Sequence, residues 1–405
     1  MTSTAFAGLR GTGKFATNEL PQDFREYILL KNPAPTPLFA LTAKMKKDAC
    51  IDTQINWWEE KQRNLRVTIN TGTTYATTST ALTIDSAADS SVTGLDLNVG
   101  DVLLVEEADA TTYAVEHILV STAPTATVVG VTRGYAGTTP ATIADNVVLM
   151  KIGTSFEEGE ALPNIVQTNP VQLSNITQIF RSVYGITETA KHVKTRTGDP
   201  LMNDRKRKSF SHARDIEWSM LFGLMNLGDG TSQKKRTMNG LRAFLTTNSM
   251  VFTTTPTVTT LINAISPVFD YGVEGEMSNE RIVLAGSAWL NNLNVILKTD
   301  SSSRLSWDGT MDVYGLKLSK LIMPQGTLGL MPHPLMSIHP VFKYGAFVIN
   351  PKSIIYRPLE GRDTKDLKNR QAPGDDSEKG EWLTELTMEV HGEETMAYIG
   401  NLTNP

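Results

Sequence analysis

The chain has 405 residues, of which 40% are hydrophobic and 20% are charged, a composition typical of a globular protein with two or three subdomains. No stretch approaches the roughly 20 consecutive apolar residues of a membrane helix, and the start of the chain lacks the pattern of a signal peptide. Cys50 is the only cysteine, which excludes an internal disulfide and a metal cluster held by cysteines. We expect a protein that is made and used in a cytoplasm and is held together by packing.

The net charge of −5 is unevenly distributed along the chain. Residues 67–150 contain nine acidic residues and one base, Arg133, and so carry a charge of −8, whereas the remainder has 37 bases and 34 acidic residues. This contrast indicates that two differently charged pieces are joined in one chain.

Residues 1–50 show little sustained periodicity. They include the run Asn32–Pro37, in which three prolines favour an extended backbone without internal hydrogen bonds. Composition alone predicts an arm without stable structure of its own, and chain termini are ordered mainly where something holds them. We expect neighbouring copies of the chain to hold this arm.

Trp57 and Trp58 are adjacent in the sequence and are followed by Glu59 and Glu60. Neighbouring residues of a strand point to opposite faces, so one of the two tryptophans is expected in a core. The other is a candidate contact with a neighbouring chain, because tryptophan is enriched at the energetic centres of interfaces.

The acidic segment 67–150 is rich in Thr, Val, Ala and Gly, and three of its runs have the composition of short strands: 101–105, 113–120 and 126–132. Turns are expected at Gly100-Asp101, at Arg133-Gly134 and at Gly137–Pro140. The segment is therefore predicted to be a small all-β domain that is inserted into a larger domain of mixed helix and strand.

The clearest helix is predicted after Thr197, because Asp199 can cap it and Pro200 can take its first position. It is expected to end before Gly228. Its apolar face would be formed by Phe210, Ala213, Ile216, Met220, Leu221 and Leu224. The opposite, solvent-facing side is expected to carry Arg205, Lys206, Arg207, Lys208, His212 and Arg214.

The basic run Arg205–Lys208 has two interpretations. It is a solvated helix face, which needs no partner, or it lies close to DNA or to acidic groups of an adjacent subunit. Binding to DNA would be electrostatic and independent of base sequence, because phosphates carry no sequence information.

Downstream, helices are predicted at 261–269 and 287–297, on either side of a strand at 281–285, and further strands at 316–322 and 346–349. Near the end, Leu386, Met388 and Val390 alternate with polar residues, the pattern of a half-buried strand. The predicted fold class is α+β.

Six short motifs resemble, in their order, the SU-ten-type major capsid proteins of tailed bacteriophages, a branch of the Hong Kong ninety-seven capsid fold. The motifs are Asp52–Glu60, Asn175–Phe180, Arg214–Glu217, Met238–Asn248, Arg357–Asp363 and Trp382–Glu389. The resemblance covers most of residues 50–400.

The resemblance implies a map of the chain. Residues 1–50 would be the N-terminal arm, 51–175 the E-loop with the all-β insert at about 67–150, and 176–235 the peripheral domain with a spine helix at about 198–228. Residues 236–345 would form the axial domain, and the strands of 346–405 would return to the peripheral domain. Pentamers and hexamers of such a chain would close into an icosahedral shell around double-stranded DNA.

The resemblance also implies partners and contacts. Portal, scaffolding and decoration proteins would join the shell, which is assembled in the cytoplasm of the host bacterium. The loop 360–370 would lie near the junctions of capsomers. Some relatives join subunits by a lysine near the tip of the E-loop, but residues 67–150 contain no lysine, so a non-covalent shell is expected. The candidate residues for contacts with subunits or DNA are Trp57, Trp58, Glu59, Arg205, Lys206, Arg207, Lys208, Arg362 and Asp363.

Enzymatic alternatives find little support in the sequence. Gly8–Lys14 fits most of a phosphate-binding loop, but Phe15 replaces the hydroxyl that would bind magnesium and no strand precedes it. His333 and His339 lie among prolines, where a connecting loop is expected rather than a metal site. No catalytic, cofactor or metal residue is therefore predicted. Another structural protein of the virion, from a tail tube or a receptor-binding spike, is the alternative.

Overall fold

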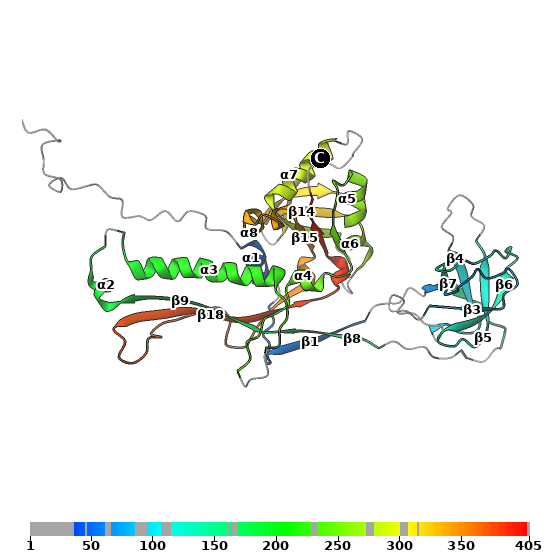
Figure 1. Ribbon diagram of the computed structural model, residues 1–405, viewed down its shortest axis with the longest axis horizontal. Coiled ribbons are helices and arrows are strands. Elements are labelled where there is room, and N and C mark those ends of the chain that lie inside the picture. Colours follow the sequence, from blue (N-terminus) through cyan, green and yellow to red (C-terminus); the bar gives the residue numbers. More distant parts are fainter. Residues whose placement is uncertain are drawn as a thin grey trace, which may run out of the picture. The chain divides into compact units, whose positions relative to one another are not determined.

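The computed structural model describes residues 36–44, 47–60, 66–85, 96–106, 115–159, 162–163, 165, 169–195, 197–228, 233–272, 279–299, 307–313 and 316–402 (Figure 1). The chain divides into two compact units. The first consists of Met1–Trp57 with Leu173–Pro405, and the second of Trp58–Gln172. Helices and sheets are both present, so the predicted α+β class is confirmed. Within the described residues, no helix has the length and apolar character to cross a membrane.

A seven-stranded sheet lies at the centre of the first unit. Its strands, in spatial order, are β10 (Ser249–Val251), β19 (Ala397–Gly400), β15 (Ala346–Ile349), β11 (Glu280–Ala285), β14 (Thr327–Pro332), β13 (Leu316–Ile322) and β12 (Trp307–Val313). Both faces of the sheet are covered: Ile282 and Leu284 of β11 belong to one buried cluster, and Val283 and Ala285 to another. Because successive side chains of a strand point to opposite faces, β11 contributes apolar residues to two separate cores.

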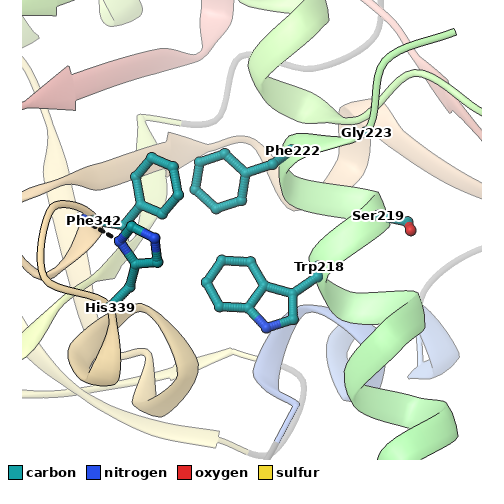
Figure 2. Close-up of a pocket in the computed structure, with 6 residues that line it drawn as sticks. All are labelled: Trp218, Ser219, Phe222, Gly223, His339 and Phe342. Carbon is teal, nitrogen blue, oxygen red and sulfur yellow. Dashed lines mark hydrogen bonds between the residues drawn. The ribbon is translucent and has the colours of Figure 1, made fainter.

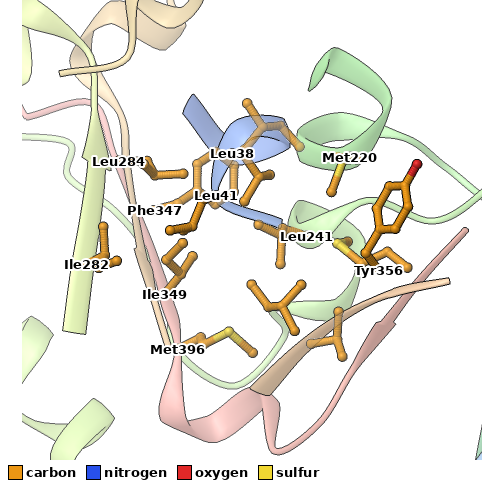
Figure 3. Close-up of a cluster of buried hydrophobic side chains, with 14 of the residues drawn as sticks. Leu38, Leu41, Met220, Leu241, Ile282, Leu284, Phe347, Ile349, Tyr356 and Met396 are labelled. Carbon is orange, nitrogen blue, oxygen red and sulfur yellow. The ribbon is translucent and has the colours of Figure 1, made fainter. Parts of the chain in front are cut away.

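The first core packs α1 (Pro37–Lys44), α3 (Pro200–Phe222) and α4 (Leu241–Phe244) against this sheet, as Figure 3 shows. The second core packs α5 (Val258–Ile265), α6 (Pro267–Asp270) and α7 (Ser287–Thr299) against the other face. The single helix predicted over 261–269 is in fact two, because Pro267 cannot continue the hydrogen-bond ladder of α5 and begins α6 instead. The other helices of the described residues include α2 (Glu188–His192), α8 (Pro334–Ile338) and the 3-10 turns Phe342–Tyr344, Pro351–Ser353 and Glu393–Thr395.

A four-stranded antiparallel sheet completes the first unit. It contains β9 (Gln178–Thr187), β16 (Ile354–Pro358), β17 (Lys365–Leu367) and the long strand β18 (Ser377–Val390), with which the other three pair. A two-stranded sheet of β1 (Gln54–Glu59) and β8 (Val171–Ile176) is also present. Helix α3 packs along β9 and β18.

The start of α3 was predicted correctly. Asp199 is the N-cap, its side chain accepts a hydrogen bond from the backbone N–H of Leu201 at 2.9 Å, and Pro200 is the first residue. The end of α3 was predicted incorrectly, because the helix stops at Phe222 rather than near residue 228. At Gly223 a Cβ atom would lie 2.6 Å from the carbonyl oxygen of Met238, so the chain after α3 runs too close to its neighbour for any side chain there.

The predicted faces of α3 need two corrections. Leu224 lies beyond the helix and is 72% exposed, and Phe210 is 40% exposed. His212, expected in solvent, is buried, and its ring nitrogens lie within hydrogen-bond distance of Ser182 and Thr384, at 3.2 and 2.7 Å. The helix therefore rests on a sheet that presents hydroxyl groups, and a histidine matches them better than an apolar side chain.

The half-buried pattern predicted for 386–390 is also wrong, because both faces of β18 are buried there. Leu386, Met388 and Val390 belong to the first core. Glu385 and Glu389 of the other face are buried as well. Glu385 and Glu389, which were predicted to be exposed to solvent, instead contact other groups within the protein.

Part of the predicted arm is a structured element. Residues 1–35, with the Gly8–Lys14 motif, lie outside the described residues, but α1 follows directly and buries Leu38 and Leu41 completely. A proline at the first position of α1 is compatible with a helix. Pro37, which was predicted to be extended, is therefore the first residue of a helix.

The second unit contains a six-stranded antiparallel sheet. The order is β2 (Arg66–Thr68), β7 (Val148–Thr154), β4 (Asp101–Glu106), β5 (His117–Thr122), β6 (Val128–Tyr135) and β3 (Ala81–Thr83). Its core is aliphatic, with Val67, Leu103, Ile118 and Leu149 among the buried residues. The turn predicted at Arg133-Gly134 is wrong: both residues lie inside β6, where the register with β5 is irregular and Gly134 has φ +65°.

Candidate functional site

Trp57 and Trp58 point to opposite faces of β1, as predicted. Trp57 is 6% exposed, and its ring centroid lies 5.9 Å from that of Phe244 and 6.1 Å from that of His391. Trp58 is 60% exposed, and Glu59 beside it is half-buried. One tryptophan is thus core, while the contact role of Trp58 and Glu59 stays a prediction.

The basic run at the start of α3 is divided between the protein and solvent. Arg205 is half-buried, forms an ion pair with Asp366 and places its guanidinium 5.6 Å from the ring centre of Trp382. The indole N–H of Trp382 donates to the carbonyl oxygen of Arg205 at 3.2 Å. The prediction that Arg205 lies on the solvent-facing side is therefore wrong.

The next three residues of the run are different. Lys206 and Arg207 are exposed and Lys208 is half-buried. Within the part of the chain that the structure describes, none of the three forms an ion pair. These three cations are the part of the run that is available to an external partner.

A row of buried carboxylates runs along β18. Glu381, Glu385 and Glu389 lie on one face of the strand, four residues apart, so they are every second side chain on that face. The ion pairs to this row are Arg181 and Arg370 with Glu381 at 2.5 and 3.2 Å, Arg362 and Arg236 with Glu385 at 2.6 and 3.2 Å, and Arg357 with Glu389 at 3.4 Å. The arginines come from three regions of the chain: β9, the segment before α4, and residues 357–370 around β16 and β17. Because an unpaired buried carboxylate is costly, the row fixes those regions against the strand.

The charged loop after β16 folds back onto this row. Arg362 pairs with Glu385, and Asp363 accepts a hydrogen bond from the hydroxyl of Tyr356 at 2.8 Å and lies 3.7 Å from the ammonium of Lys47. Burial, followed by the nearby charge of Asp363, raises the pKa of Tyr356 above its usual range. Both candidate residues of the loop thus have partners within the chain, and a contact with another subunit stays a prediction.

A buried Glu217–His333 pair was missed by sequence reasoning. Nε2 of His333 lies 2.8 Å from Oε1 of Glu217, and both side chains are completely buried. The carboxylate of Glu217 also accepts from the backbone N–H groups of Leu38 and Phe39 at 2.8 and 2.6 Å. Glu217 therefore holds the first turn of α1 against α3, and the one signal in the sequence was a glutamate on an apolar stripe.

His333 and His339 serve as caps rather than as members of a loop or metal site. Nδ1 of His333 accepts from the backbone N–H of Met336 at 3.2 Å, and Nδ1 of His339 accepts from those of Val341 and Phe342 at 3.1 and 3.2 Å. Among the described residues, no group of three or more His, Cys, Asp or Glu side chains is arranged to hold a metal ion.

An aromatic cavity of about 360 Å³ opens between α3 and the turn after α8. It is lined by Trp218, Ser219, Phe222, Gly223, His339 and Phe342. The rings of Phe222 and Phe342 are stacked with centroids 4.1 Å apart, and those of His339 and Phe342 at 4.3 Å. Figure 2 shows the four ringed side chains pointing toward one another around the opening.

In the second unit, the one base of the acidic segment is internal. Arg133 donates twice to the carboxylate of Glu116, at 2.6 Å each, and Glu116 also accepts from the backbone N–H groups of Gly134 and Ala141. Burial acts to raise the pKa of Glu116, but the hydrogen bonds from Arg133 and the backbone hold it below the usual range. At the base of the unit, Lys151 is held by Asp101 at 2.7 Å.

Comparison with known proteins gives a consistent picture. A family model described as SU10 major capsid protein matches residues 4–403. The major capsid protein of Pseudomonas phage PaMx41 is 25% identical over 247 residues, which cover 59% of this chain and 58% of that protein. The match thus spans somewhat more than half the length of this curated relative.

Solved structures with similarity include the capsid of Myoviridae phage XM1, at 10% identity and a TM-score of 0.46, with 94% of this chain and 97% of that chain covered. The capsid of a native GTA particle has 8% identity and a TM-score of 0.46, with 97% and 98% covered. The SrpI encapsulin of Synechococcus elongatus has 9% identity and a TM-score of 0.40, with 58% and 77% covered.

Proposed function

Because the chain belongs to the SU10 major capsid protein family, we propose that it is the subunit of a tailed-phage head, in which pentamers and hexamers close into an icosahedral shell around double-stranded DNA. The observation that carries the proposal is the family match over residues 4–403, nearly the whole chain. The role is structural: the chain forms part of a capsid, and its location is the virion. Assembly takes place in the cytoplasm of the host bacterium.

The parts of the chain have separate roles in this proposal. Residues 1–50 are the arm, 51–175 the E-loop with its insert, 176–235 the peripheral domain, 236–345 the axial domain and 346–405 the returning strands. In support, α3 is a long helix that packs along β9 and β18, and the compact unit Trp58–Gln172 is inserted in the sequence between the two pieces of the other unit. Because Glu217 holds the first turn of α1 against α3, the arm is attached to the first unit at a fixed position.

The ion pairs along β18 suit a subunit that must keep its shape under mechanical stress. Five arginines converge on the carboxylates of β18, so each segment that they hold is tied to the same strand. Each such pair adds little net stability, but a buried carboxylate that lost all of its arginine partners would be left without a countercharge. The pairs therefore oppose any sliding of one segment past another.

The distribution of charge supports a proposed DNA-facing part and a proposed outward part. Lys206, Arg207 and Lys208 attract phosphates without reading sequence. The segment 67–150 carries a charge of −8, and its one base is internal, so it is repelled by DNA and faces outward. Portal and scaffolding proteins, and decoration proteins on the outer surface, complete the head. The shell is held without covalent links, in keeping with the absence of lysine from 67–150 and the pairing of Lys151 with Asp101.

Negative-stain electron microscopy of particles recovered from expressing cells tests the proposal. The expected result is closed, roughly isometric shells built from the 44.4 kDa chain. Tubes or isolated spikes would indicate another structural component of the virion, and soluble chains without assemblies under any condition of expression would contradict a capsid role.

A further inference from the structure

The aromatic cavity on α3 has no role in the function proposed above. Two aromatic residues of α3, Trp218 and Phe222, line it together with His339 and Phe342. Ile338 and Val341, the sequence neighbours of His339 and Phe342, are 71% and 66% exposed. Aromatic side chains that line an open depression, with apolar residues at its rim, are typical of the anchoring point of an interface.

The cavity can bind backbone as well as apolar side chains. Nδ1 of His339 accepts hydrogen bonds from Val341 and Phe342, so in the neutral ring Nε2 carries the proton. Neither this nitrogen nor Nε1 of Trp218 has a partner within the described part of the chain. Two N–H donors beside an apolar floor fit an extended segment, which offers carbonyl oxygens between apolar side chains.

The chain itself contains such a segment outside the described residues. Residues Phe24–Leu30 read Phe-Arg-Glu-Tyr-Ile-Leu-Leu and contain five apolar or aromatic side chains. The described chain begins at Thr36, and Leu38 and Phe39 bind Glu217, the residue directly before Trp218. Each copy therefore carries both an open aromatic cavity and, ahead of α1 in the sequence, an apolar segment.

The spacer between the segment and α1 favours the cavity of another copy. Lys31–Thr36 contains Pro33 and Pro35, and proline-rich backbone extends by about 3.1 Å per residue, so six steps cover about 19 Å. The lining from Trp218 to Phe222 extends about 6 Å along α3 at 1.5 Å per residue. A spacer of that length would exceed the lining of the cavity in its own copy. In a ring of identical subunits, the next copy offers the same cavity.

We propose that the cavity of Trp218, Phe222, His339 and Phe342 receives residues Phe24–Leu30 of a neighbouring copy, which links subunits tail to body around the capsomer. The inference rests on the proposed shell, because it requires many copies in a repeated arrangement. It goes further in naming the two surfaces that meet.

Disulfide trapping in the full-length protein tests the proposal. In a Cys50→Ser background, one variant carries Ser219→Cys in the cavity and another carries Leu29→Cys in the arm. Both are co-expressed, shells are isolated and oxidised, and a non-reducing denaturing gel follows. The expected product is a covalent dimer of twice 44.4 kDa, since a disulfide requires Cα atoms within about 7 Å. A Ser211→Cys variant, eight residues earlier on α3, is the matched control and yields no dimer with Leu29→Cys.

The outcomes separate this inference from the proposed function. Shells that form without dimers from the Ser219→Cys mixture overturn the inference and leave the capsid role standing. A doubly substituted chain that forms an internal disulfide, while the mixture forms no dimer, shows that each arm occupies its own cavity and also overturns it. If the Cys50→Ser background and the unmodified chain form no shells, the proposed function and the inference fail together.

Discussion

Glu217 joins three segments that are far apart in the sequence. Its carboxylate accepts from Leu38 and Phe39 of α1 and lies 2.8 Å from Nε2 of His333, all without contact with water. The pattern of residues along α3 predicts its apolar stripe. It cannot predict that this stripe packs against the first turn of α1 and against His333, which come from distant parts of the sequence. The sequence shows that Glu217 is charged, but it does not predict the groups that bind its carboxylate.

Glu217→Gln is therefore expected to destabilise the protein by about 3 kcal/mol, because an amide cannot accept from all three donors and the unsatisfied groups stay buried. The measurement is the free energy of unfolding in urea. Asp215→Asn, an exposed change two residues away on α3, is the control and should alter it by less than about 0.5 kcal/mol. Equal effects of the two changes would contradict the anchoring role.

His212 gives the stability a pH dependence of defined sign. Burial lowers its pKa below the usual 6.5, and the charge of Asp215 opposes this only in part. The unfolded chain then binds a proton at a higher pH than the folded chain does. The stability that His212 contributes is present above pH 6.5 and is lost as pH falls from there through the lower folded pKa.

The corresponding variant is His212→Gln, which keeps a polar side chain near Ser182 and Thr384 without titrating. The free energy of unfolding, measured from pH 7.5 to 5, should fall less steeply below pH 6.5 for the variant than for the unmodified protein. Parallel pH profiles would show that His212 titrates equally in both states and would contradict its burial.

Among the elements, those defined by local chemistry were predictable and those defined by neighbours were not. The start of α3 follows from Asp199 and Pro200, which act on the backbone directly. Its end follows from the close approach of Met238 to Gly223, a contact between distant segments. The burial of both faces of β18 likewise requires knowledge of the arginines that reach its carboxylates, which alternation cannot supply.

The candidate residues divide in the same way. Opposite orientations of Trp57 and Trp58 follow from the period of a strand and are confirmed. The solvent-facing position predicted for Arg205 fails because Asp366 and Trp382 come from a strand pair that the sequence does not place beside α3. The Glu217–His333 pair and the aromatic cavity also depend on α8 meeting α3, so neither was visible in the sequence.

An internal ion pair in the second unit joins Arg133 of β6 to Glu116, the residue before β5. Glu116→Gln leaves the guanidinium of Arg133 buried without a countercharge, which costs about 3–5 kcal/mol. Hydrogen exchange should then accelerate in β4, β5 and β6, while the seven-stranded sheet exchanges as before. The control is Glu106→Gln, which removes a partly exposed pair with Arg66 and should cost less than about 1 kcal/mol. Unchanged exchange in the second unit would contradict the proposed importance of the pair.

At the scale of the whole molecule, the arm is expected to serve assembly rather than folding. Deletion of residues 1–30 leaves α1, with Leu38 and Leu41 buried in the first core, so the body should fold with nearly unchanged unfolding free energy. Shell yield should nevertheless fall at least tenfold, because the arm supplies contacts that compact bodies lack. Yield is measured by sedimentation of particles. Normal yield from the truncated chain would remove the arm from the mechanism.

The central claim, that this chain builds an icosahedral head, is tested most directly by cryo-electron microscopy of the purified particles. The account predicts icosahedral symmetry, with pentamers of the chain at the vertices, hexamers between them and the acidic second unit on the outer surface. Particles whose density follows helical or sixfold tube symmetry, or shells whose subunits do not contain the α3 and β18 pair, would contradict it.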